Sequence, residues 1–170
     1  MTWRAKTVLA TFGAAAILAT TLIVEPAPLF IWNTSASVPI GLYHVRPAQS
    51  HFTTELVAVL PPEPLATFLD LNGYLPVGVP MLKRVLALPR QKVCRTGLTI
   101  SVDGIVLGEA RDRDGLGRPL PRWDGCRVVG EDQLFLMNWQ SDDSMDGRYF
   151  GLLPASSVIG RAFAVWTRED

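Results

Sequence analysis

The sequence has no net charge that would attract nucleic acid. Its 170 residues carry 16 basic and 16 acidic side chains, so the formal net charge at pH 7 is zero. Binding to DNA or RNA depends largely on an excess of basic side chains that neutralise phosphate groups. Nucleic acid is therefore not expected as a partner. No internal repeat or low-complexity segment is apparent, and the length suits one domain with a hydrophobic core.

Histidine and cysteine are also scarce. His44 and His51 are the only histidines, and Cys94 and Cys126 are the only cysteines. Neither histidine has a further His or Cys at the spacing that metal ligands usually keep. We therefore expect no metal ion and no other cofactor.

Long apolar runs are absent apart from one near the N-terminus, where Val8 to Val24 contains no charged residue. As a helix it would be about 26 Å long, which is just enough to cross a hydrocarbon core with flanking residues helping. Arg4 and Lys6 precede the run, so the positive-inside rule keeps the N-terminus cytoplasmic. We expect residues 1–27 to be a cytoplasmic N-terminus with a single-pass inner-membrane anchor in contact with lipid, and residues 28–170 to be periplasmic.

A cleaved secretory signal is the alternative for this run. The apolar part of such a signal has about 7 to 15 residues and is followed by small residues at the cleavage site. Here the run is longer and ends in the bulky Leu22-Ile23-Val24, which favours a retained anchor. In either case the domain that follows is exported. In an exported protein the pair Cys94 and Cys126 favours a disulfide, with two unpaired buried thiols as the alternative.

Short runs rich in Val and Ile, separated by Gly and Pro, predict a mainly β domain. A short helix is expected over Leu65 to Leu71, and Asp103-Gly104 is typical of a two-residue hairpin turn. Arg111 to Trp123 is rich in Arg, Asp, Gly and Pro, so it predicts an exposed excursion of the chain. The expected strands are Gly41–Val45, Glu55–Leu60, Met81–Leu88, Leu98–Val102, Ile105–Leu107, Gln133–Asn138 and Val158–Trp166.

Two residues carry the chemistry of the sequence. Ser37 lies in a Ser-x-Ser-x-Pro turn shortly after the apolar run. Lys83 lies in an apolar strand-like run, where burying its charged group costs free energy, so a lysine there suggests a functional role. A serine hydroxyl becomes a good nucleophile when a base removes its proton, and a lysine is such a base only when it is neutral. Apolar surroundings lower the pKa of a lysine from its usual value near 10.4 and so favour the neutral form. The alternative is that Lys83 snorkels from an edge strand, with its ammonium group in water.

Four blocks of sequence, in order, resemble the type I signal peptidases and most closely their conjugative-transfer branch, the TraF-type pilin-processing serine peptidases. The resemblance implies a signal-peptidase-like antiparallel β domain on a single N-terminal transmembrane helix, and a catalytic dyad of Ser37 and Lys83. The blocks are Ser35-Ala36-Ser37-Val38-Pro39-Ile40-Gly41-Leu42-Tyr43, Leu82-Lys83-Arg84-Val85 with Leu88-Pro89, Gly117-Arg118-Pro119-Leu120-Pro121, and Ser144-Met145-Asp146-Gly147-Arg148-Tyr149-Phe150-Gly151.

The resemblance also implies supporting roles. Ser35 would contribute its hydroxyl to an oxyanion hole, although a serine that bonds its own backbone in a turn remains an alternative. Ser144 and Asp146 match positions that orient and surround the lysine, and Arg148 matches a basic residue that pairs with the aspartate. The chain departs from the general signal peptidases at Val38, where they usually carry Met, and at Gly147, where they commonly carry Ser.

The expected function is that of a membrane-anchored serine endopeptidase that processes an exported precursor protein. The resemblance to pilin-processing enzymes implies a conjugative propilin as partner. Water would resolve the acyl-enzyme, or the acyl group would pass to the N-terminal amine of the pilin and close a ring. The alternative is a non-catalytic membrane-anchored assembly factor of a conjugation or secretion apparatus. An autoproteolytic Ser/Lys repressor is disfavoured because the N-terminus is an apolar run rather than a DNA-binding domain.

Overall fold

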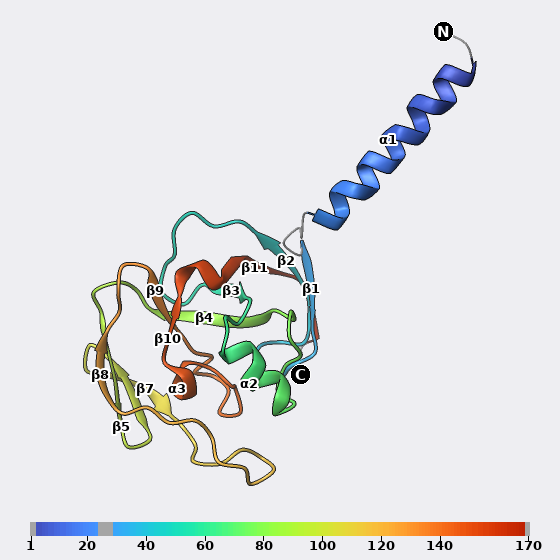
Figure 1. The fold of residues 1–170 in the computed structure, drawn as a ribbon. Helices are drawn as coiled ribbons and strands as arrows, with labels where there is room; N and C mark the ends of the chain where they lie inside the picture. Colours follow the sequence, from blue (N-terminus) through green and yellow to red (C-terminus); the bar gives the residue numbers. More distant parts are fainter. Residues whose placement is uncertain (1–2, 24–28, 169–170) are drawn as a thin grey trace.

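The computed structural model describes residues 3–23 and 29–168, and the expected boundary between residues 27 and 28 lies outside this part (Figure 1). Helix α1, Trp3–Ile23, covers most of the long apolar run and begins before it. Its described apolar side chains, such as Val8, Leu9 and Phe12, are exposed. Among the helices of the described part, none combines the length and apolar character that crossing a membrane requires.

Antiparallel strands form the larger of two sheets, which confirms the mainly β prediction. The sheet has seven strands in the order β1-β2-β11-β3-β4-β9-β10. Strand β11 carries register shifts against both of its neighbours, which bend it along its length. The strands are β1 (Phe30–Asn33), β2 (Gly41–Arg46), β3 (Leu56–Val59), β4 (Met81–Ala87), β9 (Gln133–Leu136), β10 (Leu152–Pro154) and β11 (Val158–Thr167).

The smaller sheet has four strands in the order β7-β6-β5-β8. The predicted turn at Asp103-Gly104 joins β6 to β7 with positive φ at both residues, as a two-residue hairpin requires. Strands β5 and β8 were not predicted, and neither were β1 and β10 of the larger sheet. Every residue of β8 is exposed. The strands are β5 (Lys92–Thr96), β6 (Thr99–Val102), β7 (Ile105–Glu109) and β8 (Gly125–Val128).

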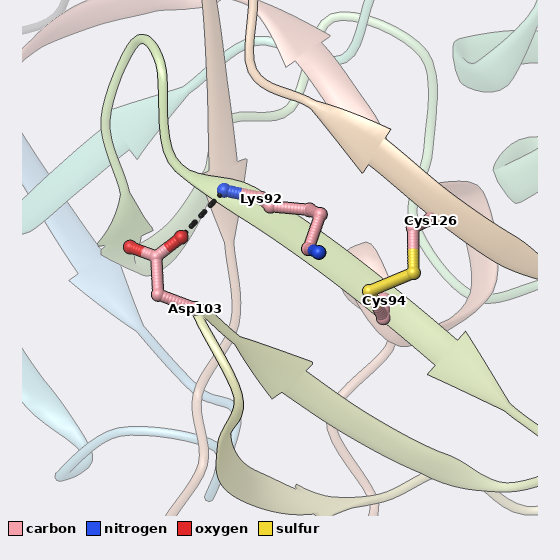
Figure 2. The surroundings of a disulfide bond; sticks show 4 residues. All are labelled: Lys92, Cys94, Asp103 and Cys126. Carbon is pink, nitrogen blue, oxygen red and sulfur yellow. Dashed lines mark hydrogen bonds between the residues drawn. A yellow bond between two sulfur atoms is a disulfide. The ribbon is translucent and has the colours of Figure 1, made fainter.

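A disulfide between Cys94 and Cys126 ties β5 to β8, as the sequence predicted (Figure 2). The two residues are directly opposite each other in the antiparallel pair. Among the described residues no cysteine is free, so the alternative of unpaired thiols is wrong. The bond closes the exposed excursion between the two strands into a loop.

Replacing Cys94 and Cys126 together by serine is expected to lower the free energy of unfolding by about 3 to 4 kcal/mol, because the unfolded chain is no longer constrained across a separation of 32 residues. Urea unfolding of the variant and of the oxidised wild type measures the difference. Reduced wild type is the control, since it should unfold at the same urea concentration as the variant. A variant as stable as the oxidised protein would contradict the prediction.

Strand β4 is central to the larger sheet and is buried on both faces. Six of its residues are buried, among them Lys83, and the exception is the half-buried Arg84. Its side chains contribute to all three apolar clusters of the domain. The remaining described helices are short: α2 (Leu65–Leu71), as predicted, α3 (Gly147–Phe150) and the 3-10 turn η1 (Ala155–Ser157). The site described next is built around β4, the turn after β1 and the loop before α3.

Candidate active site

The turn between β1 and β2 is shaped by one buried amide. The Nδ2 of Asn33 donates to the carbonyl oxygens of Ser35, Val38 and Pro39 at 2.8, 3.1 and 3.1 Å. The hydroxyl of Tyr43 donates to the same Pro39 carbonyl at 2.6 Å. These bonds hold the turn in one conformation. The role of Asn33 was not predicted, because nothing in a single sequence distinguishes an asparagine that organises a turn from one at its surface.

Ser35 and Ser37 face each other across this turn. The hydroxyl of Ser35 donates to Ser37 Oγ at 3.1 Å, and the backbone N–H of Ser37 donates to Ser35 Oγ at 3.3 Å. Ser37 is half-buried and Ser35 is exposed. The Ser35 hydroxyl thus accepts a backbone N–H of its own turn, as the alternative expected. The two groups that the resemblance assigns to an oxyanion hole, the Ser35 hydroxyl and the Ser37 N–H, are bonded to each other and lie beside the Ser37 hydroxyl.

Lys83 lies in the buried middle of the large sheet, with 5% of its surface exposed. Its Nζ donates to Ser144 Oγ at 2.8 Å. Burial disfavours the charged form and lowers the pKa of Lys83 from 10.5 to about 8, while the negative charge of Asp146 raises it and the positive charge of Arg148 lowers it further. The alternative of a lysine that snorkels to water is wrong. A lysine with this pKa is neutral in a substantial fraction of molecules near pH 8.

Asp146 and Arg148 form a fully buried ion pair, with Nε–Oδ1 and Nη2–Oδ2 distances of 2.9 Å. The carboxylate also accepts the backbone N–H groups of Asn138 at 3.0 Å and of Arg148 at 3.1 Å. The Nη2 of Arg148 reaches the carbonyls of Ser141 and Ser144 at 2.5 and 3.3 Å. The pair therefore fixes the loop that presents the Ser144 hydroxyl to Lys83.

Asn138 connects this loop to β4 on both sides of Lys83. Its Oδ1 accepts the N–H of Arg84 at 3.0 Å, and its Nδ2 donates to the carbonyl of Leu82 at 3.0 Å. From the sequence, Asn138 was predicted only as the end of a strand, without a role in the site. The contact joins residues more than fifty positions apart, so no local pattern could reveal it.

Gly147 stands where the general signal peptidases commonly carry serine, and its surroundings explain the glycine. A Cβ atom there would lie 2.6 Å from Phe135 Cε2 and 2.7 Å from the Leu136 carbonyl oxygen. A side chain would push the loop of Asp146 away from β9. The departure from the family pattern therefore fits the packing of this chain.

One cavity of about 250 Å³, here called the catalytic cavity, brings the predicted residues together. Its walls are β1 with the turn after it, the segment from Leu69 to Lys83, and residues 143–145. Ser35, Ser37, Lys83 and Ser144 line it, whereas Asp146 and Arg148 lie behind it. In the described part of the chain the Ser37 hydroxyl is bonded to Ser35 and the Lys83 ammonium to Ser144, not to each other.

The charged groups at the rim and the two histidines have other partners. The exposed Asp143 pairs with Arg111. His51 contacts the buried Glu55, and His44 stacks on Phe30. Within residues 3–23 and 29–168, no three His, Cys, Asp or Glu side chains are grouped so that they could hold a metal ion.

Comparison with known proteins identifies the family. The family model described as signal peptidase, peptidase S26, matches residues 2–167, which is almost the whole chain. This chain is a member of the S26 signal peptidase family. It is 34% identical to the plasmid transfer protein TraF of Escherichia coli over 158 residues, with 86% of each chain covered. It is 37% identical to the conjugal transfer protein TraF of Agrobacterium fabrum over 149 residues, with 79% of this chain and 81% of the relative covered.

Among solved structures, a signal peptidase I of Enterococcus faecalis V583 matches this S26 peptidase with a TM-score of 0.41 and 20% identity, covering 66% of this chain and 97% of that one. The family membership rests on the sequence matches, and the members of S26 are serine peptidases of the signal peptidase type. The resemblance stated from the four sequence blocks is thereby confirmed.

Proposed function

We propose that this S26 peptidase is a membrane-anchored serine endopeptidase in which Ser37 is the nucleophile and Lys83 the general base. The catalytic cavity supports the proposal most directly. It is lined by the half-buried Ser37 and by the buried Lys83, whose pKa is lowered to about 8. Activation of a serine by a neutral lysine needs both features. The S26 match over residues 2–167 supports the same chemistry.

The reaction begins when neutral Lys83 accepts the proton of Ser37 Oγ, which attacks the carbonyl carbon of the scissile peptide bond. The N–H of Ser37 and the hydroxyl of Ser35 donate to the oxyanion that forms. Lys83 then returns the proton to the leaving amine, and the acyl group stays on Ser37. Water, or an amine of the substrate, then attacks the ester while Lys83 takes a proton from it, and Lys83 passes this proton to the departing Ser37 oxygen.

Ser144, Asp146 and Arg148 support this dyad without contacting the scissile bond. Ser144 positions the Lys83 Nζ through their 2.8 Å hydrogen bond. Arg148 holds the Ser144 carbonyl, and Asp146 offsets the charge of Arg148. The negative charge of Asp146 also limits how far burial lowers the pKa of Lys83.

The substrate in this proposal is an exported precursor, and more narrowly a conjugative propilin. The relatives named TraF, whose length this chain largely covers, support the link to conjugation. Strand β1 is at the edge of the large sheet and lines the catalytic cavity. An extended peptide can add to such an edge through backbone hydrogen bonds, which places its scissile bond beside Ser37.

The anchor is part of the same proposal. The charge-free run Val8 to Val24, preceded by Arg4 and Lys6, supports single-pass attachment to the inner membrane with the peptidase domain in the periplasm. The exposed apolar side chains of α1 support it as well. Extraction of isolated membranes at alkaline pH tests it: the full chain is expected in the membrane fraction, and its release into the supernatant would contradict an anchor.

Co-expression with a candidate pilin precursor tests the function. Wild type is expected to lower the mass of the pilin, and the Ser37→Ala variant is expected to leave the precursor unchanged while retaining its fold. Plain cleavage and cyclisation differ by the mass of one water, so intact-mass spectrometry separates them. Processing by both proteins would overturn the role of Ser37. Binding of pilin without processing by wild type would favour the assembly-factor alternative.

A further inference from the structure

Tyr74 separates the catalytic cavity from a second hollow. This neighbouring hollow has a volume of about 390 Å³ and is lined largely by charged residues of the excursion and of the loop before α3. Tyr74, Asp143 and Met145 line both spaces, so these residues form the partition between them. Asp143 is an exposed rim residue, which leaves Tyr74 and Met145 as the larger apolar groups of the partition.

The ring of Tyr74 is fixed on more than one side. Its hydroxyl donates to Asp114 Oδ2 at 2.7 Å, across 40 positions of sequence. Arg118 donates to the same oxygen through Nε at 2.7 Å, and its guanidinium carbon lies 4.8 Å from the centre of the tyrosine ring. Phe68 packs against the ring with a centroid distance of 6.2 Å. The hydrogen bond from Tyr74 is the largest of the effects that hold the pKa of Asp114 well below its usual value.

The turn that carries Asp114 and Arg118 is itself well bonded. The other carboxylate oxygen, Asp114 Oδ1, accepts the N–H groups of Leu116 at 2.9 Å and of Arg118 at 2.8 Å. The Nη1 of Arg118 donates to the carbonyl of Asn72 at 2.7 Å. Most of the excursion is exposed. These hydrogen bonds hold its Asp114–Arg118 turn in a fixed position against the residues around Tyr74.

The segment that contains Tyr74, from Leu69 to Leu75, forms an apolar wall of the catalytic cavity. The backbone N–H groups of Tyr74 and Leu75 donate to the carbonyl of Leu69 at 2.8 and 3.3 Å. Leu69, Tyr74 and Leu75 all line the cavity. Because these residues are joined by backbone bonds, fixing the tyrosine side chain also fixes the position of the wall.

We propose that Tyr74 is a specificity-determining residue that closes the α2 side of the catalytic cavity, and that Asp114 and Arg118 position it. The inference rests on the proposed peptidase function and adds a limit on substrate size. A substrate side chain that enters the cavity meets the tyrosine ring, so short side chains fit and long ones collide with it. Loss of the ring would join the two hollows and admit longer side chains.

The test compares peptides that carry Ala or Leu at each of the three positions before the scissile bond. At one of these positions wild type is expected to prefer Ala. Tyr74→Ala is expected to lower that preference, as a ratio of kcat/KM values, by about tenfold or more, since a pocket discriminates side chains that differ by a few methylene groups to this extent. Asp114→Asn is expected to shift the ratio in the same direction but less, and Tyr74→Phe, which keeps the ring, less than Tyr74→Ala.

Matched controls separate specificity from stability. Leu71→Ala changes a neighbouring side chain that is 80% exposed, and Asp124→Asn breaks an exposed ion pair with Arg122 of the excursion. Both are expected to keep the wild-type ratio, and thermal unfolding is measured for every variant. Cleavage by wild type with an unchanged ratio in Tyr74→Ala overturns this inference alone. Failure of wild type to cleave any precursor or peptide overturns the proposed function and this inference with it.

Discussion

Replacing Lys83 by methionine is expected to abolish peptide cleavage and to stabilise the fold at the same time. In the proposed dyad Lys83 is the general base, and loss of such a base lowers kcat by at least about 10⁴-fold, as for other nucleophile–base units. Burial lowers the pKa of Lys83 to about 8, so at pH 7 most molecules hold a charged lysine in an apolar strand, which lowers the free energy of unfolding. Methionine has a similar length and no charge, and we expect a gain of about 1 to 2 kcal/mol after the loss of the bond to Ser144.

Urea unfolding at pH 7 and a peptide cleavage assay measure the two effects. Lys92→Met is the matched control, because Lys92 is an exposed lysine on β5 (Figure 2). This control is expected to leave cleavage unchanged and to bring no stability gain. A Lys83→Met variant that still cleaves peptides would contradict the role of Lys83 as the base. A variant that is less stable than wild type would contradict the view that the buried lysine destabilises the fold.

The pH dependence follows from the same group. Cleavage is expected to rise as the pH increases through about 8, because in the proposed mechanism Lys83 accepts the serine proton only after it has lost its own. Between about 8 and 10.5 the unfolded chain binds more protons than the folded one, so the stability of the fold should rise with pH in this window. Lys83→Met should lack this rise, and an equal rise in wild type and variant would show that another group causes it.

Asp146→Asn is expected to destabilise the protein by about 3 to 5 kcal/mol, because it leaves the fully buried charge of Arg148 without its partner. The carboxylate accepts four hydrogen bonds, from the N–H of Asn138 and from three groups of Arg148. An amide nitrogen cannot accept the bonds of the oxygen that it replaces. Glu131→Gln removes an exposed ion pair with Arg90 and is the control, with an expected change of less than about 0.5 kcal/mol.

A second measurement tests whether Asp146 also acts on Lys83. The charge of Asp146 raises the pKa of Lys83, and that of Arg148 lowers it. In the folded fraction of Asp146→Asn, the rise of cleavage with pH should therefore move to lower pH. Loss of stability alone would reduce the amount of active protein but leave the position of the profile unchanged. An unshifted profile would limit Asp146 to a structural role.

Local chemistry explains what could be predicted from the sequence. Apolar runs bounded by Gly and Pro located seven strands to within a few residues, and Asp103-Gly104 located the hairpin between β6 and β7. Helix α2 matches its predicted range, Leu65–Leu71. The pair Cys94 and Cys126 was predicted from the number of cysteines and the expected export. In each case the signal lies in the side chains of the element itself.

Contacts between distant segments could not be predicted in this way. Strand β8 has only exposed residues, so it carries no apolar pattern, and it is a strand because β5 pairs with it. Asn33 and Asn138 act through their amide groups on backbone atoms that the folded chain brings to them. The contact of Tyr74 with Asp114 likewise depends on how a long exposed excursion returns to α2.

The strand order of the large sheet makes the separation of Ser37 and Lys83 depend on the curvature of that sheet. Strands β1 and β4 are separated by β2, β11 and β3, so in a flat sheet their axes would be about 19 Å apart. Residues of both strands nevertheless line one cavity. We infer that the sheet curves between them, where the register shifts of β11 lie. At one of these shifts Gly160 packs so tightly that a Cβ would lie 2.5 Å from the Arg46 carbonyl oxygen. A change that straightens β11 is therefore expected to move the turn of Ser37 away from Lys83 and, in the proposed dyad, to abolish cleavage without altering either residue.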